Sequence, residues 1–236
     1  MKISKLFSIP ENSSVRHKWV VDRILEIQPG LSILDAGCGT QRYKKYCSHL
    51  NYHSQDFGEY DSVGDGKNLQ IDSWIYGDID YKGDIWSINE IDEKFDTILC
   101  TEVLEHIPFP NETIQELARL LKPGGSLIIT APFSSIPHMT PYYFYSGFHK
   151  NWYQMIAKQN NLKISKIIEN GNIYNFVSQE INRSSNIQKR FIIKFLLKIY
   201  FRLFVIPILN LMSIYGERQK LLPFGYHVIM KKSLNI

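Results

Sequence analysis

Cysteine is scarce in this chain of 236 residues, and so are long uninterrupted apolar runs. Its three cysteines, Cys38, Cys47 and Cys100, are too few for a disulfide framework, and their odd number favours a reducing compartment. The opening residues MKISKLFSIPENSS hold no sustained apolar core and no small-residue cleavage site, so we expect no signal peptide. We therefore expect a cytoplasmic location. The composition is otherwise ordinary, which excludes a collagen-like or mainly disordered chain.

A strong charge of one sign is also missing, since 27 Lys and Arg stand against 23 Asp and Glu. The net charge of +4 is too small to indicate a nucleic-acid-binding protein. Its distribution is uneven, because residues 183–236 carry ten bases and a single acid, Glu217. This basic, aromatic-rich part of the chain is expected to meet an anionic surface or substrate.

Residues 191–215 are the one stretch long enough to be considered as a membrane span. Lys194, Lys198 and Arg202 interrupt it, and Pro207 would kink it. The three bases recur at intervals of four residues, so a helix would carry them on one face beside an apolar remainder. We predict a basic amphipathic helix that packs on its own domain, on a second subunit in a homodimer, or on a membrane surface, rather than one that spans.

Strand and helix patterns alternate along most of the chain. Strands are predicted over residues 31–36, 51–57, 95–101, 126–133, 162–169 and 225–232, of which 31–36 and 95–101 are buried apolar runs, with a short strand pair inside the irregular segment 58–83. Helical spacing predicts helices around residues 20–25, over 111–121 with Asn111 as N-cap, and over 147–160. This order predicts a doubly wound, mainly parallel sheet, in which ligands bind beyond the carboxyl ends of the strands.

Chemistry-bearing residues stand at those strand ends. Asp35 ends the first strand, and Gly37 and Gly39 let the following turn approach a ligand closely, although a Gly-x-Gly turn alone also occurs without a ligand. Asp56 ends the second strand, where an acid can accept hydrogen bonds from ribose hydroxyls. Asp84 beside Ile85 suits an adenine ring, with Asp78 and Asp80 as alternatives to Asp84.

Two further motifs complete the set: FDTILCTEVLEHIP at 95–108 and LLKPGGSLIITAP at 120–132. Together the motifs resemble, over residues 15–170, the class I S-adenosylmethionine-dependent methyltransferases of the type 11-like group. The resemblance implies a Rossmann-like, doubly wound α/β sheet of seven strands with helices on both faces. Arg42 stands where a dinucleotide-binding fingerprint has its third glycine, which counts against a nicotinamide cofactor.

The resemblance also implies which residues bind S-adenosyl-L-methionine. Asp35, Gly37 and Gly39 would hold the methionine end and Asp56 the ribose. Asp84 and Ile85 would hold the adenine, while Thr101 and Glu102 would line the methionine pocket.

Methyl transfer to a hydroxyl benefits from a base, because a protonated alcohol is a poor nucleophile. His106, His138 and His149 are candidate catalytic residues, although each also fits a plain polar residue at a pocket edge. Glu102, Glu105 and His106, with His149 as a distal ligand, resemble the divalent-metal motif of ubiquinone-biosynthesis and RNA 2′-O-methyltransferases. The same pentapeptide is common in class I enzymes without a metal, and we expect none.

The aromatic segment 137–153 follows the fifth strand, where class I enzymes place the acceptor. Its aromatic rings could stack on the faces of a sugar acceptor, or they could cover the end of the sheet as part of the core. The run resembles methyltransferases of bacterial surface-polysaccharide synthesis, so we expect an O-methyltransferase acting on a small molecule or glycan and binding no nucleic acid. A metal-assisted RNA 2′-O-methyltransferase and a non-catalytic membrane-surface adaptor are the alternatives.

The long stretch between the last two predicted strands exceeds any hairpin loop. We therefore predict one domain over residues 1–236, with a helical insertion over 173–222. Contact of residues 187–215 with a membrane surface is one expectation for this insertion.

Overall fold

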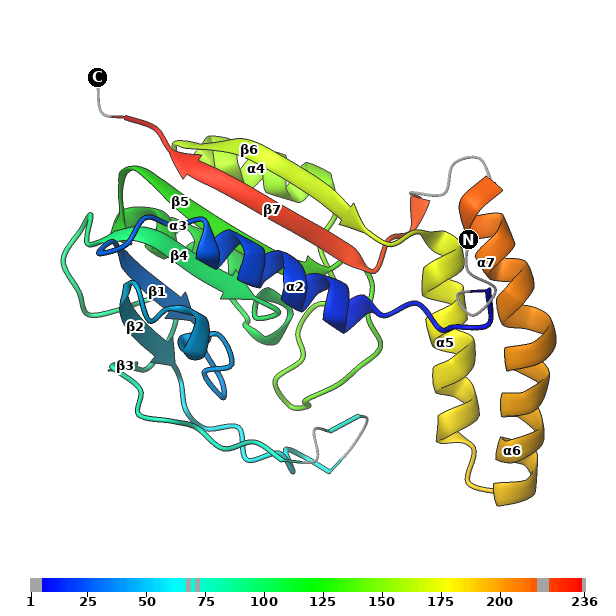
Figure 1. The fold of residues 1–236 in the computed structure, drawn as a ribbon. Helices are drawn as coiled ribbons and strands as arrows, with labels where there is room; N and C mark the ends of the chain where they lie inside the picture. The colour runs from blue at the N-terminus through cyan, green and yellow to red at the C-terminus, as the bar shows by residue number, and fades with distance from the viewer. Residues whose placement is uncertain (1–5, 67–68, 71–72, 216–220, 235–236) are drawn as a thin grey trace. The chain divides into compact units, whose positions relative to one another are not determined.

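The structure, a computed structural model, describes residues 6–66, 69–70, 73–215 and 221–234 (Figure 1). The chain forms two compact units. One consists of residues 16–168 and 226–236, and the other of residues 1–15 and 169–225. The expected single domain over 1–236 stays a prediction.

A seven-stranded sheet forms the first unit. Its strands are β1 Ser32–Ala36, β2 Asn51–Asp56, β3 Tyr81–Lys82, β4 Phe95–Thr101, β5 Leu121–Pro132, β6 Leu162–Asn170 and β7 Gly225–Lys232, in the spatial order β3-β2-β1-β4-β5-β7-β6. The pairs β1–β2, β1–β4, β2–β3 and β4–β5 are parallel. β7 runs opposite to its neighbours (Figure 1). The predicted Rossmann-like sheet is confirmed.

Helices cover both faces of this sheet because successive strand residues point to opposite sides. Ile33 and Leu99 pack with α2 (Asn12–Leu25), whose Val20 and Ile24 are buried. Leu34, Ile98 and their neighbours pack instead with α3 (Pro110–Leu120) and α4 (Lys150–Gln159). The alternation of apolar residues along β1 and β4 thus builds two cores, one on each side.

The predictions for the start of α3 and the start of the fifth strand are wrong. Asn111 is not the N-cap of α3, because Pro110 occupies the first turn and the Phe109 carbonyl accepts the Thr113 N–H; the Asn111 side chain accepts a hydrogen bond from Trp152 instead. The fifth strand begins at Leu121 rather than at residue 126. A register shift after Phe95 lets the Lys-Pro-Gly-Gly turn enter the sheet as an irregular strand start.

The irregular segment 58–83 holds only one strand among its described residues, β3, in place of the expected pair. Part of it pairs with the loop after β5: a bridge joins Leu69 and His138, and the Met139 N–H donates to the Leu69 carbonyl. The aromatic loop after β5 and this segment therefore support each other.

In the described part of the chain between β6 and β7, helical segments run from residue 173 to residue 215, which confirms the helical insertion before the last strand. They are α5 Ile173–Ile187, α6 Phe191–Tyr200, the π-helix η3 Phe201–Val205 and α7 Ile206–Tyr215. Pro207 lacks the N–H of a regular helix, and the π turn directly before it accommodates the missing bond. No helix in the described part of the chain is long and apolar enough to cross a membrane.

Candidate active site

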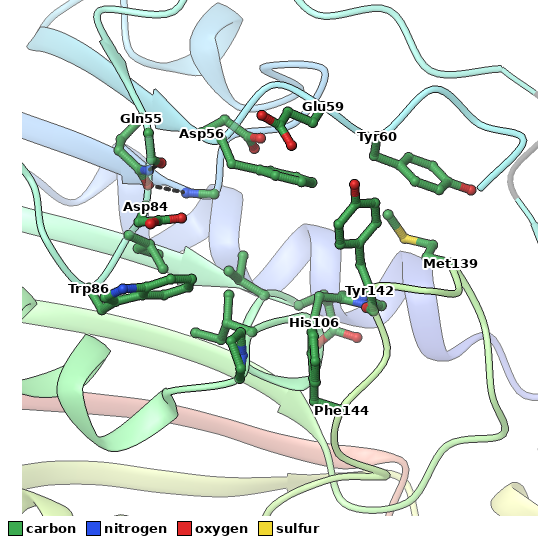
Figure 2. A pocket seen from close by; sticks show the side chains of 18 of the residues that line it. Gln55, Asp56, Glu59, Tyr60, Asp84, Trp86, His106, Met139, Tyr142 and Phe144 are labelled. Atoms are coloured by element: carbon green, nitrogen blue, oxygen red, sulfur yellow. Dashed lines mark hydrogen bonds between the residues drawn. The ribbon is translucent and has the colours of Figure 1, made fainter. Parts of the chain in front are cut away.

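A cavity of about 320 Å³ opens over the carboxyl ends of β1, β2 and β4 (Figure 2). Parallel sheets bind ligands at this edge, and the volume is within the range of small-molecule sites. Side chains from the loops after β2, β3, β4 and β5 surround it. Its lining residues are Gly37, Gln55, Asp56, Phe57, Glu59, Tyr60, Trp74, Tyr76, Gly83, Asp84, Ile85, Trp86, Glu102, Val103, His106, Ile107, Pro108, Met139, Tyr142 and Phe144.

The glycine turn after β1 takes a conformation that side chains oppose. Gly37 has φ +72° and Gly39 has φ +51°, both in the left-handed region. A Cβ at residue 37 would collide with Val103, and one at residue 39 would lie 2.6 Å from Cζ2 of Trp74. The predicted glycines are therefore required by the backbone itself, and Gly37 forms part of the cavity wall.

Asp56 is held in place by the same turn. Its Oδ2 accepts the Gly39 N–H at 2.8 Å and its Oδ1 accepts the Gly58 N–H at 3.0 Å. Burial raises the pKa of this carboxyl, and the backbone donors oppose the rise. The side chain lines the cavity, where the ribose-binding acid was predicted.

Gln55 joins two walls of the site and was not singled out from the sequence. Its Oε1 accepts the Gly37 N–H at 3.2 Å (dashed in Figure 2), and its Nε2 donates to the Gly83 carbonyl at 2.7 Å. The side chain thus ties the glycine turn to the loop after β3. Its place one residue before Asp56, at the end of β2, is the signal that could have found it.

The three acids left open for the adenine end have different surroundings. Asp84 and Ile85 line the cavity. Asp80 accepts hydrogen bonds from the backbone and hydroxyl of Ser54, and neither it nor Asp78 is part of the wall. The geometry favours Asp84.

Asp35 and Thr101 do not line the cavity, although both stand at strand ends. Asp35 is 1% exposed and accepts a hydrogen bond from the Tyr52 hydroxyl at 2.9 Å. Burial raises the pKa of Asp35 to about 7. The acid therefore lies beneath the glycine turn, and a direct contact with the methionine end stays a prediction.

Glu102 reaches the cavity from a strained backbone position, with φ +56°. Its carboxylate forms an ion pair with Arg16 at 2.9 Å, and its N–H donates to the Thr130 carbonyl. α2 thereby helps to hold this part of the wall.

Among the three candidate histidines, only His106 lines the cavity. It lies at the end of the short 3-10 helix η2 (Leu104–His106), and its Nδ1 is 2.6 Å from the Tyr142 carbonyl oxygen. Because a carbonyl only accepts, Nδ1 carries the proton and Nε2 of the neutral ring has a lone pair. Burial lowers the pKa of His106 to about 4, so the neutral form prevails near neutral pH.

His138 and His149 have other surroundings. The His138 ring packs edge-on against the His106 ring, with centroids 4.7 Å apart. His138 lies in the loop after β5. His149 is the N-cap of α4, and its Nδ1 accepts the Asn151 N–H at 3.2 Å. The helix begins at Lys150, three residues later than predicted, which places His149 in a structural position.

Glu105, His106 and His138 each offer a metal-ligand atom, and these three atoms lie within 4.8 Å of one another. This set differs from the one that the sequence suggested. Burial raises the pKa of Glu105 well above its ordinary value. Of the residues that the sequence suggested, Glu102 forms an ion pair with Arg16 and His149 caps α4, so neither belongs to this set.

The aromatic segment after β5 divides between wall and core. Tyr142 and Phe144 line the cavity, while Phe148 and Tyr153 are buried in the core of the sheet. Trp86 lies toward one end of the cavity and Tyr142 toward the other (Figure 2). Some rings of the aromatic segment therefore line the cavity, and others cap the sheet, so both predicted roles occur.

A family model described as a methyltransferase domain matches residues 15–169. The chain belongs to this methyltransferase family. The predicted methyltransferase family is thereby confirmed.

Two curated relatives and one solved structure illustrate the similarity. The chain is 28% identical to a ubiquinone biosynthesis O-methyltransferase of Pseudomonas entomophila over 49% of this chain and 50% of the relative. It is 33% identical to a tRNA U34 carboxymethyltransferase of Nautilia profundicola over 41% of this chain and 33% of the relative. The chain thus spans half or less of these relatives. An S-adenosylmethionine-dependent methyltransferase of Archaeoglobus fulgidus shares the fold, with TM-score 0.56, 16% identity, and coverage of 94% of this chain and 95% of that one.

The residues of the cavity fit S-adenosylmethionine as the cofactor. The close-approaching turn at Gly37 suits the methionine end, and the Asp56 carboxylate suits the ribose hydroxyls. Asp84 beside Ile85 and the Trp86 ring suit the adenine. When bound, the cofactor supplies an electrophilic methyl group.

Proposed function

We propose that this enzyme methylates a hydroxyl group of a small molecule or sugar, with His106 as the general base. The observation that carries the proposal is the fixed tautomer of His106, whose proton lies on Nδ1 toward Tyr142. Nε2 is thereby the basic nitrogen of a residue in the cavity wall.

The surroundings of His106 support a ring-shaped acceptor. Met139, Tyr142 and Phe144 line the same part of the cavity. Aromatic faces stack on sugar or aryl rings, and they exclude water from the reacting groups. The chain's contribution is to orient the acceptor and to remove its proton, and alignment alone supplies much of the acceleration.

His106→Asn tests the role of the ring nitrogen. An asparagine retains an N–H that can donate to the Tyr142 carbonyl but has no counterpart of Nε2. Screened against nucleotide sugars, glycan fragments, phenols and amines, the wild type is expected to methylate a hydroxylated acceptor. The variant should be slower by about a hundredfold or more, with cofactor binding retained.

His149→Asn is the matched control, because asparagine is also a good N-cap. It should transfer methyl groups at the wild-type rate. Wild-type transfer to a hydroxyl by His106→Asn would contradict the proposal, and so would methylation of amines alone.

A further inference from the structure

The helical unit leaves one side of α6 and η3 apolar and exposed. Over residues 191–205 the less exposed positions recur at helical spacing, at Lys194, Leu197, Phe201 and Val205, so Lys194 lies on this less exposed side. α5 contacts both α6 and α7 within this unit. The opposite side forms what we call the outer apolar face, which consists of Ile192, Phe195, Leu196, Ile199 and Leu203, each at least 41% exposed.

This exposure is too extensive to be incidental. More than half of the large apolar residues exposed in the described part of the chain lie between residues 187 and 215. Single exposed apolar residues are normal on a soluble surface, whereas a contiguous set indicates an interaction site. Phe191, Tyr200 and Tyr215 add aromatic rings of the kind enriched at membrane–water interfaces.

The charges on the same segment have one sign. Residues 187–215 contain five bases and no acid. Lys198 and Arg202 are exposed one helical turn apart, along one edge of the outer apolar face. Neither has an ion-pair partner in the described part of the chain.

We propose that the outer apolar face docks on an anionic lipid bilayer, lying in the plane of its surface. Acyl chains accept the apolar side chains, and the headgroups receive the ammonium and guanidinium groups at the edge. A second copy of the chain fits less well, because a two-fold contact uses the same face on both subunits, and residues 187–215 would then carry bases on both sides of the contact and no acid to neutralise them.

Vesicle flotation of the full chain tests the proposal without any acceptor. The wild type should float with vesicles of phosphatidylcholine and phosphatidylglycerol in equal parts, and only weakly with phosphatidylcholine alone. Lys198→Gln with Arg202→Gln should weaken the binding about 25-fold, two factors of roughly five, and added salt should weaken wild-type binding. Lys163→Gln with Lys166→Gln, an exposed pair on β6, is the charge-matched control and should bind like the wild type.

Leu196→Gln with Leu203→Gln tests the apolar component. Both residues are more than half exposed, so the variant should keep the wild-type circular dichroism and cofactor affinity while losing the vesicles. Absence of wild-type binding to anionic vesicles would overturn the proposal. So would a dimer in sedimentation velocity that the leucine variant dissociates while vesicle binding persists, since the face would then be a subunit contact.

Discussion

At the scale of single residues, burial decides what each acid and histidine of the site can do. Asp35 and Asp56 are both aspartates at strand ends. Asp56 lines the cavity with two backbone donors, whereas Asp35 is enclosed with one donor, Tyr52. The two acids therefore differ in role although they look alike in the sequence.

Asp35 should make stability depend on pH. Its pKa is about 7 in the folded protein against 3.8 ordinarily, because burial disfavours the charge. Between these values the folded state binds more protons than the unfolded state, so the contribution of Asp35 to stability is full below the lower value and declines as pH rises toward 7. Asp35→Asn lacks this decline. The unfolding free energy of the variant minus that of the wild type should rise by up to about 1.4 kcal/mol per pH unit across that window.

Urea unfolding without cofactor, at about pH 5 and about pH 8, measures the difference. All other titrating groups are common to both proteins, so their contributions cancel. A free-energy difference that is equal at the two pH values would show that Asp35 is ionised throughout.

At the scale of secondary structure elements, the ends of the elements carry the functional residues. The β2 end supplies Gln55 and Asp56, and η2 supplies His106. The start of α4 has a structural role instead, because His149 caps it. His106 therefore lines the cavity and His149 caps a helix because they lie at the ends of different elements.

His149 should matter for stability and not for methyl transfer. His149→Ala removes the acceptor for the Asn151 N–H and should destabilise the protein by about 1 kcal/mol relative to His149→Asn. Both variants lose the ring contacts with Phe133 and Tyr226, so their difference isolates the cap. Urea unfolding measures it. Equal stability of the two variants would show that the cap contributes nothing, and loss of transfer in His149→Asn would make the residue catalytic.

The sequence predicted the parts of the site that depend on local pattern. The glycine turn follows the apolar strand β1 directly and Asp56 ends β2, so their place at the sheet edge could be inferred, whereas Asp84 follows the two-residue strand β3 and was one of three open choices. Trp74 and Tyr76 could not be found in this way, because the irregular segment 58–83 has no periodicity and tertiary packing alone brings them to the wall.

Long-range contacts account for the other differences. The pairing of His138 with His106 arises where the loop after β5 bonds to the backbone of Glu105 through Phe144 and Tyr145. The helix α3 begins one residue earlier than predicted because Pro110 suits the first helical position, where its missing N–H leaves no donor unpaired.

At the scale of the whole molecule, the two units carry different surfaces. The family match at residues 15–169 falls almost entirely within the sheet unit, which contains the cavity. Residues 173–215 lie beyond the match and carry the outer apolar face. The family match therefore falls on the unit that contains the cavity, and the outer apolar face lies outside the matched residues.

Binding of S-adenosylhomocysteine, followed by calorimetry, tests the central claim that the cavity is the cofactor site. The intact wild-type protein should bind it saturably, in the micromolar range. Asp56→Ala should bind more weakly with an unchanged circular dichroism spectrum, because the carboxylate in the cavity wall is lost. Absence of binding to the folded wild type, or wild-type affinity in Asp56→Ala, would contradict the assignment.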